Sequence, residues 1–336
     1  MSTEPSNFPR LTLIRTHFDR INQPVEEIQE FESAILREGG CEVVTGLPRL
    51  PWFKVTARLV AAGALVLERL LSLARRGGSR TRTYLCIGYI APHYLAHKSF
   101  PYFTLPGARR VVWLYDAWEK DLPEIARTLL RWRIDVAFVS SRQAAEYLNA
   151  IPGCAAHWLP EAVTVDVHHS KPWDQRTIDV LQLGRRWDWY HHAIEPLCHA
   201  RGWNYRFEEK PRALVFPTRQ GFIDGLADAK ISICVPSSIT HPERSGAVET
   251  MTWRYLQSMA SGCLVLGRMP AEMRALFDYE PMLEIDEGDP AGQLADVLAD
   301  FQRHIPLLQR NLAFVRDHHQ WPQRWDSLRR ALGLSS

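Results

Sequence analysis

Residues 249–266 read ETMTWRYLQSMASGCLVL and contain a complete transition from a helix to a buried strand. Polar residues recur there at a spacing of four, three and four, so they share one helix face: Thr250, Arg254, Gln257 and Ser261. The opposite face is apolar, as packing against a sheet requires. Gly262 is a typical helix stop, and the Cys-Leu-Val-Leu run after it has no charged side chain. The segment predicts a helix over 250–261 that packs on a sheet with both faces covered.

Apolar strand-like runs alternate with helical patterns along the rest of the chain as well. Strands are expected at 11–15, 41–45, 84–90, 110–115, 134–140, 155–159, 178–184, 203–207, 230–235 and 263–267. Helices are expected at 25–38, 54–76, 122–133, 142–150, 190–200, 220–228, 250–261, 271–277 and 290–302. This order predicts an α/β fold with two doubly wound, Rossmann-like parallel sheets. We expect one domain over 1–167, a polar linker over 167–176, a second domain over 177–315 and a terminal segment over 316–336.

The composition limits the classes of function. The 336 residues are 46% apolar and 23% charged, so a compact globular protein is expected. The 40 cationic residues, six Lys and 34 Arg, stand against 38 acidic ones, and a net charge of +2 is too small to bind nucleic acid through bulk charge. The six cysteines contain no CxxC pair, which is typical of buried thiols in a reducing compartment. With no hydrophobic leader and no apolar run of spanning length, the sequence predicts a cytoplasmic location.

The start of the helix over 250–261 is a candidate anion site. Its backbone N–H groups and the positive end of its dipole suit a phosphate, and Thr250 and Thr252 add hydroxyls. Gln257 follows two turns later on the same face, where a sugar joined to a helix-bound diphosphate would lie. The alternative is that this polar face is only solvated.

Residues 249–262 resemble the signature of GT-B-fold, retaining glycosyltransferases of the large GT4-type superfamily, in which a Glu, seven residues and a second Glu precede Ala-Met-Ala-x-Gly. Thr252-x-Arg254 and the downstream strand are similar to the branch that includes spore-maturation-type glycosyltransferases. The 134–141 run, followed by 159–163, looks like the last strand of the family's N-domain and the entry to its crossover. The 178–185 run looks like the strand that opens the C-terminal domain, and the 222–237 run looks like the helix and strand before the donor loop. The resemblance covers roughly 110–300. It implies two Rossmann-like domains that face a cleft, with a final helix that crosses back to the N-domain.

The same resemblance implies a nucleotide-diphosphate sugar donor, UDP before GDP, held by the second domain. Glu249 stands where the family contacts hydroxyls of the donor sugar, and Gln257 replaces the Glu that binds the ribose. Arg185 matches the Gly-Arg arginine at the diphosphate. The family's phosphate lysine has no counterpart, so Arg186 or Arg254 is expected to supply the second cation. Further donor-binding candidates are Phe216 and Pro217 at the base edge, and Ser245, Gly246, Thr250 and Thr252 near the helix start.

The mechanism that the resemblance implies is electrostatic. Cations and helix-end amides stabilise the charge of the diphosphate leaving group, with Glu249, Arg185 and Arg254 as catalytic residues and without a metal or another cofactor. In the first domain the family histidine falls near Tyr115 and Asp116, where this chain has none. After the 84–90 strand, His93 and His97 are further cleft candidates. The expected activity is hexosyl transfer with retention, in the synthesis of a glycan, glycolipid or natural-product glycoside, and no nucleophile is assigned.

Other interpretations stay open. Gln257, the missing lysine and the missing histidine also fit a GT-B-shaped protein that binds a nucleotide sugar without transferring it, and a nucleotide-sugar epimerase is a third interpretation. The helix over 54–76 is basic at both ends and apolar between them, so it either packs on the sheet or lies on an anionic membrane. The second choice leaves open a lipid-linked acceptor and peripheral contact with the inner face of a membrane. The acceptor itself is not identified.

Three other patterns are given structural roles. Adjacent histidines at 168–169, 191–192 and 318–319 diverge on a helix or strand, so we expect solvated surface and not a metal site. The acidic run 286–289 precedes a helix, where turn and N-cap roles explain it. Trp321 and Trp325 are spaced by four and are expected to anchor the final helix on the first domain.

Overall fold

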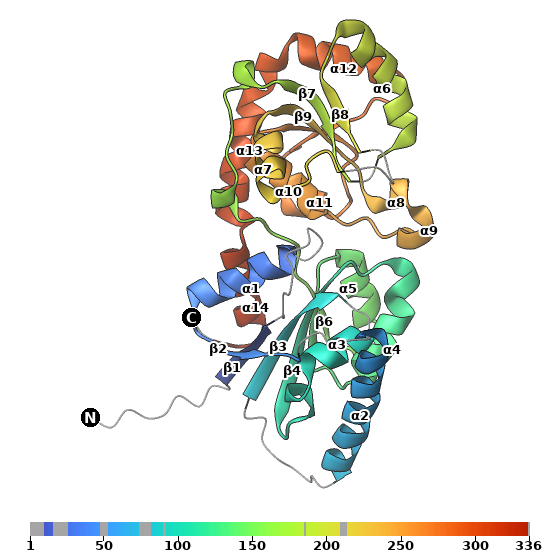
Figure 1. Cartoon of the computed structure of the whole chain (residues 1–336), viewed down its shortest axis with the longest axis vertical. Helices are drawn as coiled ribbons and strands as arrows, with labels where there is room; N and C mark the ends of the chain where they lie inside the picture. The colour runs from blue at the N-terminus through green and yellow to red at the C-terminus, as the bar shows by residue number, and fades with distance from the viewer. Residues whose placement is uncertain are drawn as a thin grey trace, which may run out of the picture. The chain divides into compact units, whose positions relative to one another are not determined.

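The computed structural model describes residues 10–15, 26–47, 53–73, 82–89, 92–184, 186–208 and 214–334 (Figure 1). The chain forms two compact units. The first comprises Met1–Pro160 together with Arg324–Ser336, and the second comprises Glu161–Gln323. Each unit is built on one parallel sheet.

The sheet of the first unit has its strands in the order β2-β1-β3-β4-β5-β6. They are β1 (Arg10–Arg15), β2 (Glu42–Thr45), β3 (Arg82–Tyr89), β4 (Ala108–Tyr115), β5 (Val136–Val139) and β6 (Ala156–Trp158). The central strand β4 is buried from Arg110 to its end, which explains its nearly continuous apolar sequence. Tyr89 pairs with Tyr115, so β3 and β4 end at the same level of the sheet.

The helices of the first unit are α1 (Glu26–Glu38), α2 (Phe53–Leu73), α3 (Pro92–Ser99), α4 (Leu122–Arg131) and α5 (Arg142–Asn149). The terminal helix α14 (Trp321–Ala331) also belongs to this unit, from Arg324 onward. Arg109 Nη1 donates a hydrogen bond of 3.0 Å to the carbonyl of Leu332 just beyond α14. Trp321 and Trp325 are fully buried. The predicted return of the final helix to the first unit is therefore confirmed.

The sheet of the second unit has the order β11-β10-β9-β7-β8. Its strands are β7 (Ile178–Gln182), β8 (Tyr205–Phe207), β9 (Ala229–Cys234), β10 (Leu264–Gly267) and β11 (Leu283–Glu284). The helices are α6 (Asp188–Arg201), α7 (Arg219–Ala227), α8 (Ser237–Thr240), α9 (Pro242–Ser245), α10 (Trp253–Ala260), α11 (Met273–Leu276), α12 (Pro290–Ala299) and α13 (Ile305–His318).

The strand order reverses at one point in each sheet. In both, the first strand in chain order lies between the second and the third, namely β1 between β2 and β3, and β7 between β8 and β9. Doubly wound sheets bind ligands beyond the carboxyl ends of the strands at such a reversal. In the second unit this position lies beyond the ends of β7 and β9.

The structure confirms the predicted α/β class with two doubly wound parallel sheets, and each predicted strand is present with its ends shifted by at most two residues. Five differences concern helices and one a strand. The helix predicted over 250–261 begins only at Trp253. The segments 92–99, 237–240, 242–245 and 305–318 form helices that the apolar pattern did not indicate, and the two-residue β11 was also not predicted. Among the described residues, no helix has both the length and the apolarity that crossing a membrane requires.

Candidate functional site

The candidate site of the second unit lies where its strand order reverses. The loop after β7 contains Gly184, and the long connection after β9 leads through α8 and α9 to α10. Most of the residues singled out in the sequence belong to these two connections: Arg185, Arg186, Ser245, Gly246, Glu249, Thr250, Thr252, Arg254 and Gln257. The sheet order thus brings to one edge two segments that lie some 60 residues apart in the chain.

Gly184 shapes the loop after β7. It adopts a left-handed conformation with φ of 79°, which glycine tolerates without strain, and its N–H donates a hydrogen bond of 3.0 Å to Glu208 Oε2. Arg185, the predicted diphosphate arginine, lies outside the described residues. Arg186 pairs with Asp188 at 2.7 Å, and its guanidinium carbon lies 5.7 Å from the centre of the Phe207 ring. Arg186 is thus held by its own helix start and by β8.

Arg254 meets this loop from the first turn of α10. Its guanidinium carbon lies 4.8 Å from the centre of the Phe222 ring, a distance typical of a cation–π contact. A Cβ placed on Gly184 would be 3.9 Å from Arg254 Nη2, so the arginine lies directly beside the glycine. The structure therefore places one predicted cation next to the Gly-Arg loop. An arginine fixed on an aromatic ring at this edge is suited to bind an oxyanion such as a diphosphate.

The start of α10 differs from the expected open anion site. The N–H of Trp253 donates a hydrogen bond of 2.6 Å to Glu161 Oε2, and the N–H of Met251 donates to Glu272 Oε1. The hydroxyl of Thr250 donates to the same Glu272 oxygen at 2.8 Å. Both carboxylates are almost completely buried. Two protein carboxylates thus already hold backbone amides that were expected to be open to a phosphate, because negative charge is stabilised at a helix start whatever its source.

The polar face of α10 is buried, so the interpretation of this face as merely solvated is wrong. Gln257 is 4% exposed, and Ser261, which ends the helix, is 0% exposed. His168 Nδ1 lies 3.1 Å from Ser261 Oγ. Burial, followed by the positive charge of Arg219, lowers the pKa of His168 to about 4. The face that Gln257 shares with Arg254 is therefore covered by protein over part of its length.

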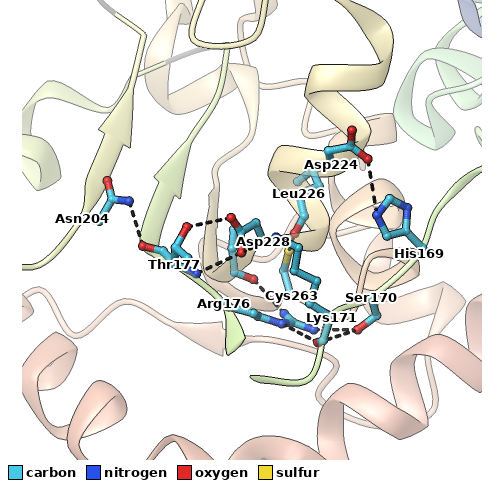
Figure 2. Close-up of polar contacts among 11 residues, drawn as sticks. His169, Ser170, Lys171, Arg176, Thr177, Asn204, Asp224, Leu226, Asp228 and Cys263 are labelled. Atoms are coloured by element: carbon cyan, nitrogen blue, oxygen red, sulfur yellow. Dashed lines mark hydrogen bonds and ion pairs between the residues drawn. The ribbon is translucent and has the colours of Figure 1, made fainter. Parts of the chain in front are cut away.

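The segment 167–176 is not a linker but part of the second unit, and Figure 2 shows polar contacts that its residues make. The buried guanidinium of Arg176 donates to the carbonyls of Ala229 and Gly262 at 2.7 Å each, to the carbonyl of Lys171 at 3.0 Å and to Ser170 Oγ at 2.7 Å. A cation that satisfies three carbonyls fixes the chain where it enters β7. Polar residues of this segment, which suggested a linker, form hydrogen bonds within the second unit.

Ion pairs strengthen the same attachment (Figure 2). Lys171 pairs with Asp228 at 3.0 Å, and His169 lies 3.4 Å from Asp224. Asp228 also accepts hydrogen bonds from the N–H and the hydroxyl of Thr177, at 3.0 and 2.7 Å. The segment is therefore joined to α7 and to the residue before β9.

The other donor-binding candidates have clear structural contacts. Ser245 is fully buried, and its hydroxyl lies 2.6 Å from Ser237 Oγ, while Gly246 ends α9 with φ of 58°. Glu249 is partly exposed, and its Oε2 accepts the N–H of Ala271 at 3.2 Å. Phe216 packs so closely on α7 that a Cβ on Gly225 would be 2.1 Å from its ring. Of these residues, Pro217 is exposed and Thr252 is partly exposed just before α10.

The candidates of the first unit lie at the carboxyl ends of β3 and β4. Tyr115 is buried as the last residue of β4, and Asp116 follows it with φ of 57°, a left-handed conformation that is uncommon for a residue other than glycine. His93 lies in the first turn of α3, and its side chain is outside the described residues. His97 is buried within α3, and burial lowers its pKa.

The adjacent histidines are not simply solvated surface, and that prediction is wrong for one member of each pair. His191 and His319 are buried and His168 is partly buried, because these rings pack against aromatic or polar neighbours. His191 Nδ1, for example, lies 3.1 Å from the hydroxyl of Tyr205. Among the side chains that the structure describes, no group of three His, Cys, Asp or Glu could hold a metal ion. The predicted N-cap is confirmed, since Asp289 Oδ1 accepts the N–H of Gly292 at 2.8 Å.

Sequence reasoning missed the residues that complete this site: Glu161, Glu272, Phe222 and His168. Glu161 lies in the Leu-Pro-Glu-Ala-Val run that resembles the family's crossover, but nothing local shows that it binds the start of α10. The sequence offers one signal for these two carboxylates, a proline directly before Glu161 and another two residues before Glu272.

Solved structures with similar folds cover almost the whole chain. Anabaena HepE in complex with UDP and glucose is 10% identical, with a TM-score of 0.57 over 97% of this chain and 100% of that chain. Sucrose-phosphate synthase from Thermosynechococcus elongatus is 13% identical, with a TM-score of 0.58 over 97% and 99%. The N-terminal domain of Candida albicans trehalose-6-phosphate phosphatase is 8% identical, with a TM-score of 0.59 over 100% and 99%.

At these identities the likeness shows the fold, which is GT-B as the signature had indicated. No protein-family model and no curated protein matches the sequence. The spore-maturation-type branch therefore stays a prediction.

Proposed function

We propose that the protein is a metal-independent glycosyltransferase that moves a hexosyl group, with retention, from a nucleotide-diphosphate sugar, UDP before GDP, to an acceptor. The observation that supports this most is Arg254, held on the Phe222 ring beside Gly184 at the reversal point of the second sheet. The GT-B fold, which a protein solved with UDP and glucose shares, adds to it. In this proposal the second unit is the donor-side half and the first the acceptor-side half.

The reaction breaks the bond between the anomeric carbon and a diphosphate oxygen, so negative charge develops on the leaving diphosphate. Arg254 stabilises that charge together with Arg185 or Arg186, because fixed cations need no reorganisation at the moment of transfer. Glu249 contacts hydroxyls of the donor sugar. Gln257, one turn after Arg254, binds the ribose through a neutral amide. Asp116 and His93 are the acceptor-side candidates.

The first experiment is a titration with UDP, GDP and ADP and with their glucose conjugates, followed by calorimetry and by thermal unfolding. We expect UDP to raise the unfolding temperature and to bind far more tightly than uridine. If none of the nucleotides stabilises the protein, the donor site is wrong.

Arg254→Ala tests the role of the cation. We expect UDP affinity to fall by about 10- to 100-fold, since a hydrogen bond to a charged group contributes about 1.5–3 kcal/mol, while uridine affinity changes little. Arg310→Ala is the matched control, because Arg310 also lies on an aromatic ring of the second unit, 3.6 Å from the centre of Tyr279. An equal loss in both variants contradicts the proposal.

A second candidate function, nucleotide-sugar binding without transfer, is favoured by the start of α10. There Glu161 and Glu272 already hold backbone amides, and Gln257 lacks the charge that the family has at its position. This candidate predicts that UDP binds but that UDP-sugars are neither hydrolysed nor transferred to any sugar or lipid acceptor. Release of UDP from a UDP-sugar over long incubation decides between the two.

A further inference from the structure

Helix α2 of the first unit presents a long apolar face to solvent. Five of its large aliphatic side chains are exposed, with exposed fractions of 52% for Val55, 67% for Leu59, 59% for Val66, 38% for Leu67 and 60% for Leu70. Val55, Leu59, Val66 and Leu70 are spaced by four, seven and four, so they form one line along the helix. We call these five residues the α2 face. A run of exposed aliphatic residues of this kind marks an interaction surface.

The helix is held on the sheet by its other side. Ala57 and Ala64 are 0% and 1% exposed, and Ala64 belongs to the core cluster together with Leu95 and Ala96 of α3. Alanine has a small side chain, so α2 and α3 approach closely there. The core therefore uses the alanine side of the helix, and among the described residues its core cluster includes no member of the α2 face. Packing on the sheet explains one half of α2 only.

The charges on α2 match an anionic surface. Arg58 and Arg69 are exposed and border the α2 face along one edge. An apolar line bordered by arginines is the pattern of helices that lie in the interface of an anionic bilayer.

The dimensions favour a bilayer over a protein. A helix of 21 residues is about 31 Å long, and a face about 10 Å wide then has about 300 Å². A stable protein interface buries about 800 Å² on each partner. We propose that the α2 face docks on the surface of a membrane that contains anionic lipids, with the aliphatic side chains below the headgroups and Arg58 and Arg69 at the phosphates. This proposal does not rest on the proposed function, since it concerns the first unit alone.

Flotation of the full chain with vesicles tests the proposal. We expect the protein to float with vesicles of phosphatidylcholine and phosphatidylglycerol, and much less with phosphatidylcholine alone. Leu59→Gln combined with Leu70→Gln should lower the bound fraction by about 10-fold or more, because two leucines that enter the lipid on binding are lost. Arg58→Gln should lower it by about fivefold, and added salt should remove that difference.

Leu36→Gln combined with Leu130→Gln is the matched control, since both leucines are exposed in the first unit but outside α2. This variant should float like the wild type. Because all the substituted leucines are exposed, thermal unfolding should be unchanged, which separates lipid binding from folding. The proposal is overturned if the wild type does not float with anionic vesicles, or if the α2 variant floats equally well. It is also overturned if sedimentation shows a dimer that the α2 variant abolishes, since the face is then a contact between two copies.

Discussion

The two ends of α10 are built with opposite chemistry. At its start, the buried carboxylates of Glu161 and Glu272 accept backbone N–H groups. Beyond its end, the guanidinium of Arg176 donates to backbone carbonyls, including that of Gly262. Acids at the start and a cation at the end both suit the helix dipole. The difference is that the start also carries Arg254 beside Gly184, whereas the cation at the end, Arg176, is bound to other groups of the protein.

This contrast separates the two halves of the family-like signature. Gly262 has φ of 68°, and a Cβ there would lie 2.6 Å from Ser170 Oγ. The fold alone thus requires glycine at this position, whatever the protein binds. The start of the helix, in contrast, holds the charged group of Arg254 beside Gly184. The Met-Ala-Ser-Gly half therefore reports on the fold, and function is to be sought in the Glu249–Arg254 half.

Of the substitutions considered, Arg176→Met, at the end of α10, should lower the free energy of unfolding most. It removes four hydrogen bonds and leaves the carbonyls of Ala229 and Gly262 buried without their donor. We expect a loss of about 4 kcal/mol or more in the free energy of unfolding, measured by urea denaturation. Lys171→Met is the control, because the half-exposed pair with Asp228 should contribute less than about 1 kcal/mol. Similar losses in both variants would show that Arg176 does not fix the entry to β7.

His168 makes the end of α10 sensitive to pH. Its pKa is about 4 in the folded protein because of burial, while an unfolded histidine has a pKa of about 6.5. Between these values the unfolded chain binds more protons, so stability falls as the pH falls from about 6.5 to about 4. The partly exposed ring should account for about 2–3 kcal/mol of this loss.

The measurement is the urea midpoint of the wild type and of His168→Asn across this pH range. Asn cannot take up a proton, so the variant should lose less stability toward acid. The two proteins should change in parallel above neutral pH. Equal slopes in acid would mean that His168 does not titrate differently in the folded protein.

Gly262→Ala tests whether the end of the signature is explained by packing. We expect a loss of about 2–3 kcal/mol, from the left-handed conformation together with the contact on Ser170. Gly202→Ala is the matched control, since Gly202 has φ of 65° and no atom within 4 Å of the added Cβ. It should lose about 1 kcal/mol. If the Gly202 variant is as unstable as the Gly262 variant, the contact with Ser170 does not contribute to the loss of stability.

The sequence predicted the sheets better than it predicted the site, and α10 shows why. Apolar runs such as 263–267 locate strands because burial on both faces is a local property of the residues. The start of α10 was placed three residues too early, because Glu161 and Glu272 set it from positions 92 and 21 residues away. The residues around the helix start do not indicate that such distant partners exist. For the same reason the polar segment 167–176 looked like a linker although it is attached to α7 and β9.

Part of the candidate site could be predicted from the sequence. The Gly-Arg run after β7 and Arg254 were singled out from the sequence, and the structure brings Gly184 and Arg254 together. Phe222 was not singled out, because an aromatic residue in an apolar helix looks like core until a cation is found on its ring. The first unit has no comparable signature, so its candidate residues could be proposed only because they lie at the ends of predicted strands.

The smallest effect is expected at the start of α10, where Glu272→Gln removes one negative charge and keeps the shape of the side chain. If a diphosphate binds beside Arg254, it experiences repulsion from Glu272, so the variant should bind UDP about fivefold more tightly, which corresponds to about 1 kcal/mol. The gain should shrink with added salt and be absent for uridine, which carries no phosphate. Glu284→Gln is the control, because Glu284 also accepts a backbone N–H, that of Met269 at 3.1 Å, but its side chain is 36% exposed. A weaker binding of UDP by the Glu272 variant, with the control unchanged, would mean that this carboxylate serves the anion site by holding the Met251 loop and does not repel its ligand.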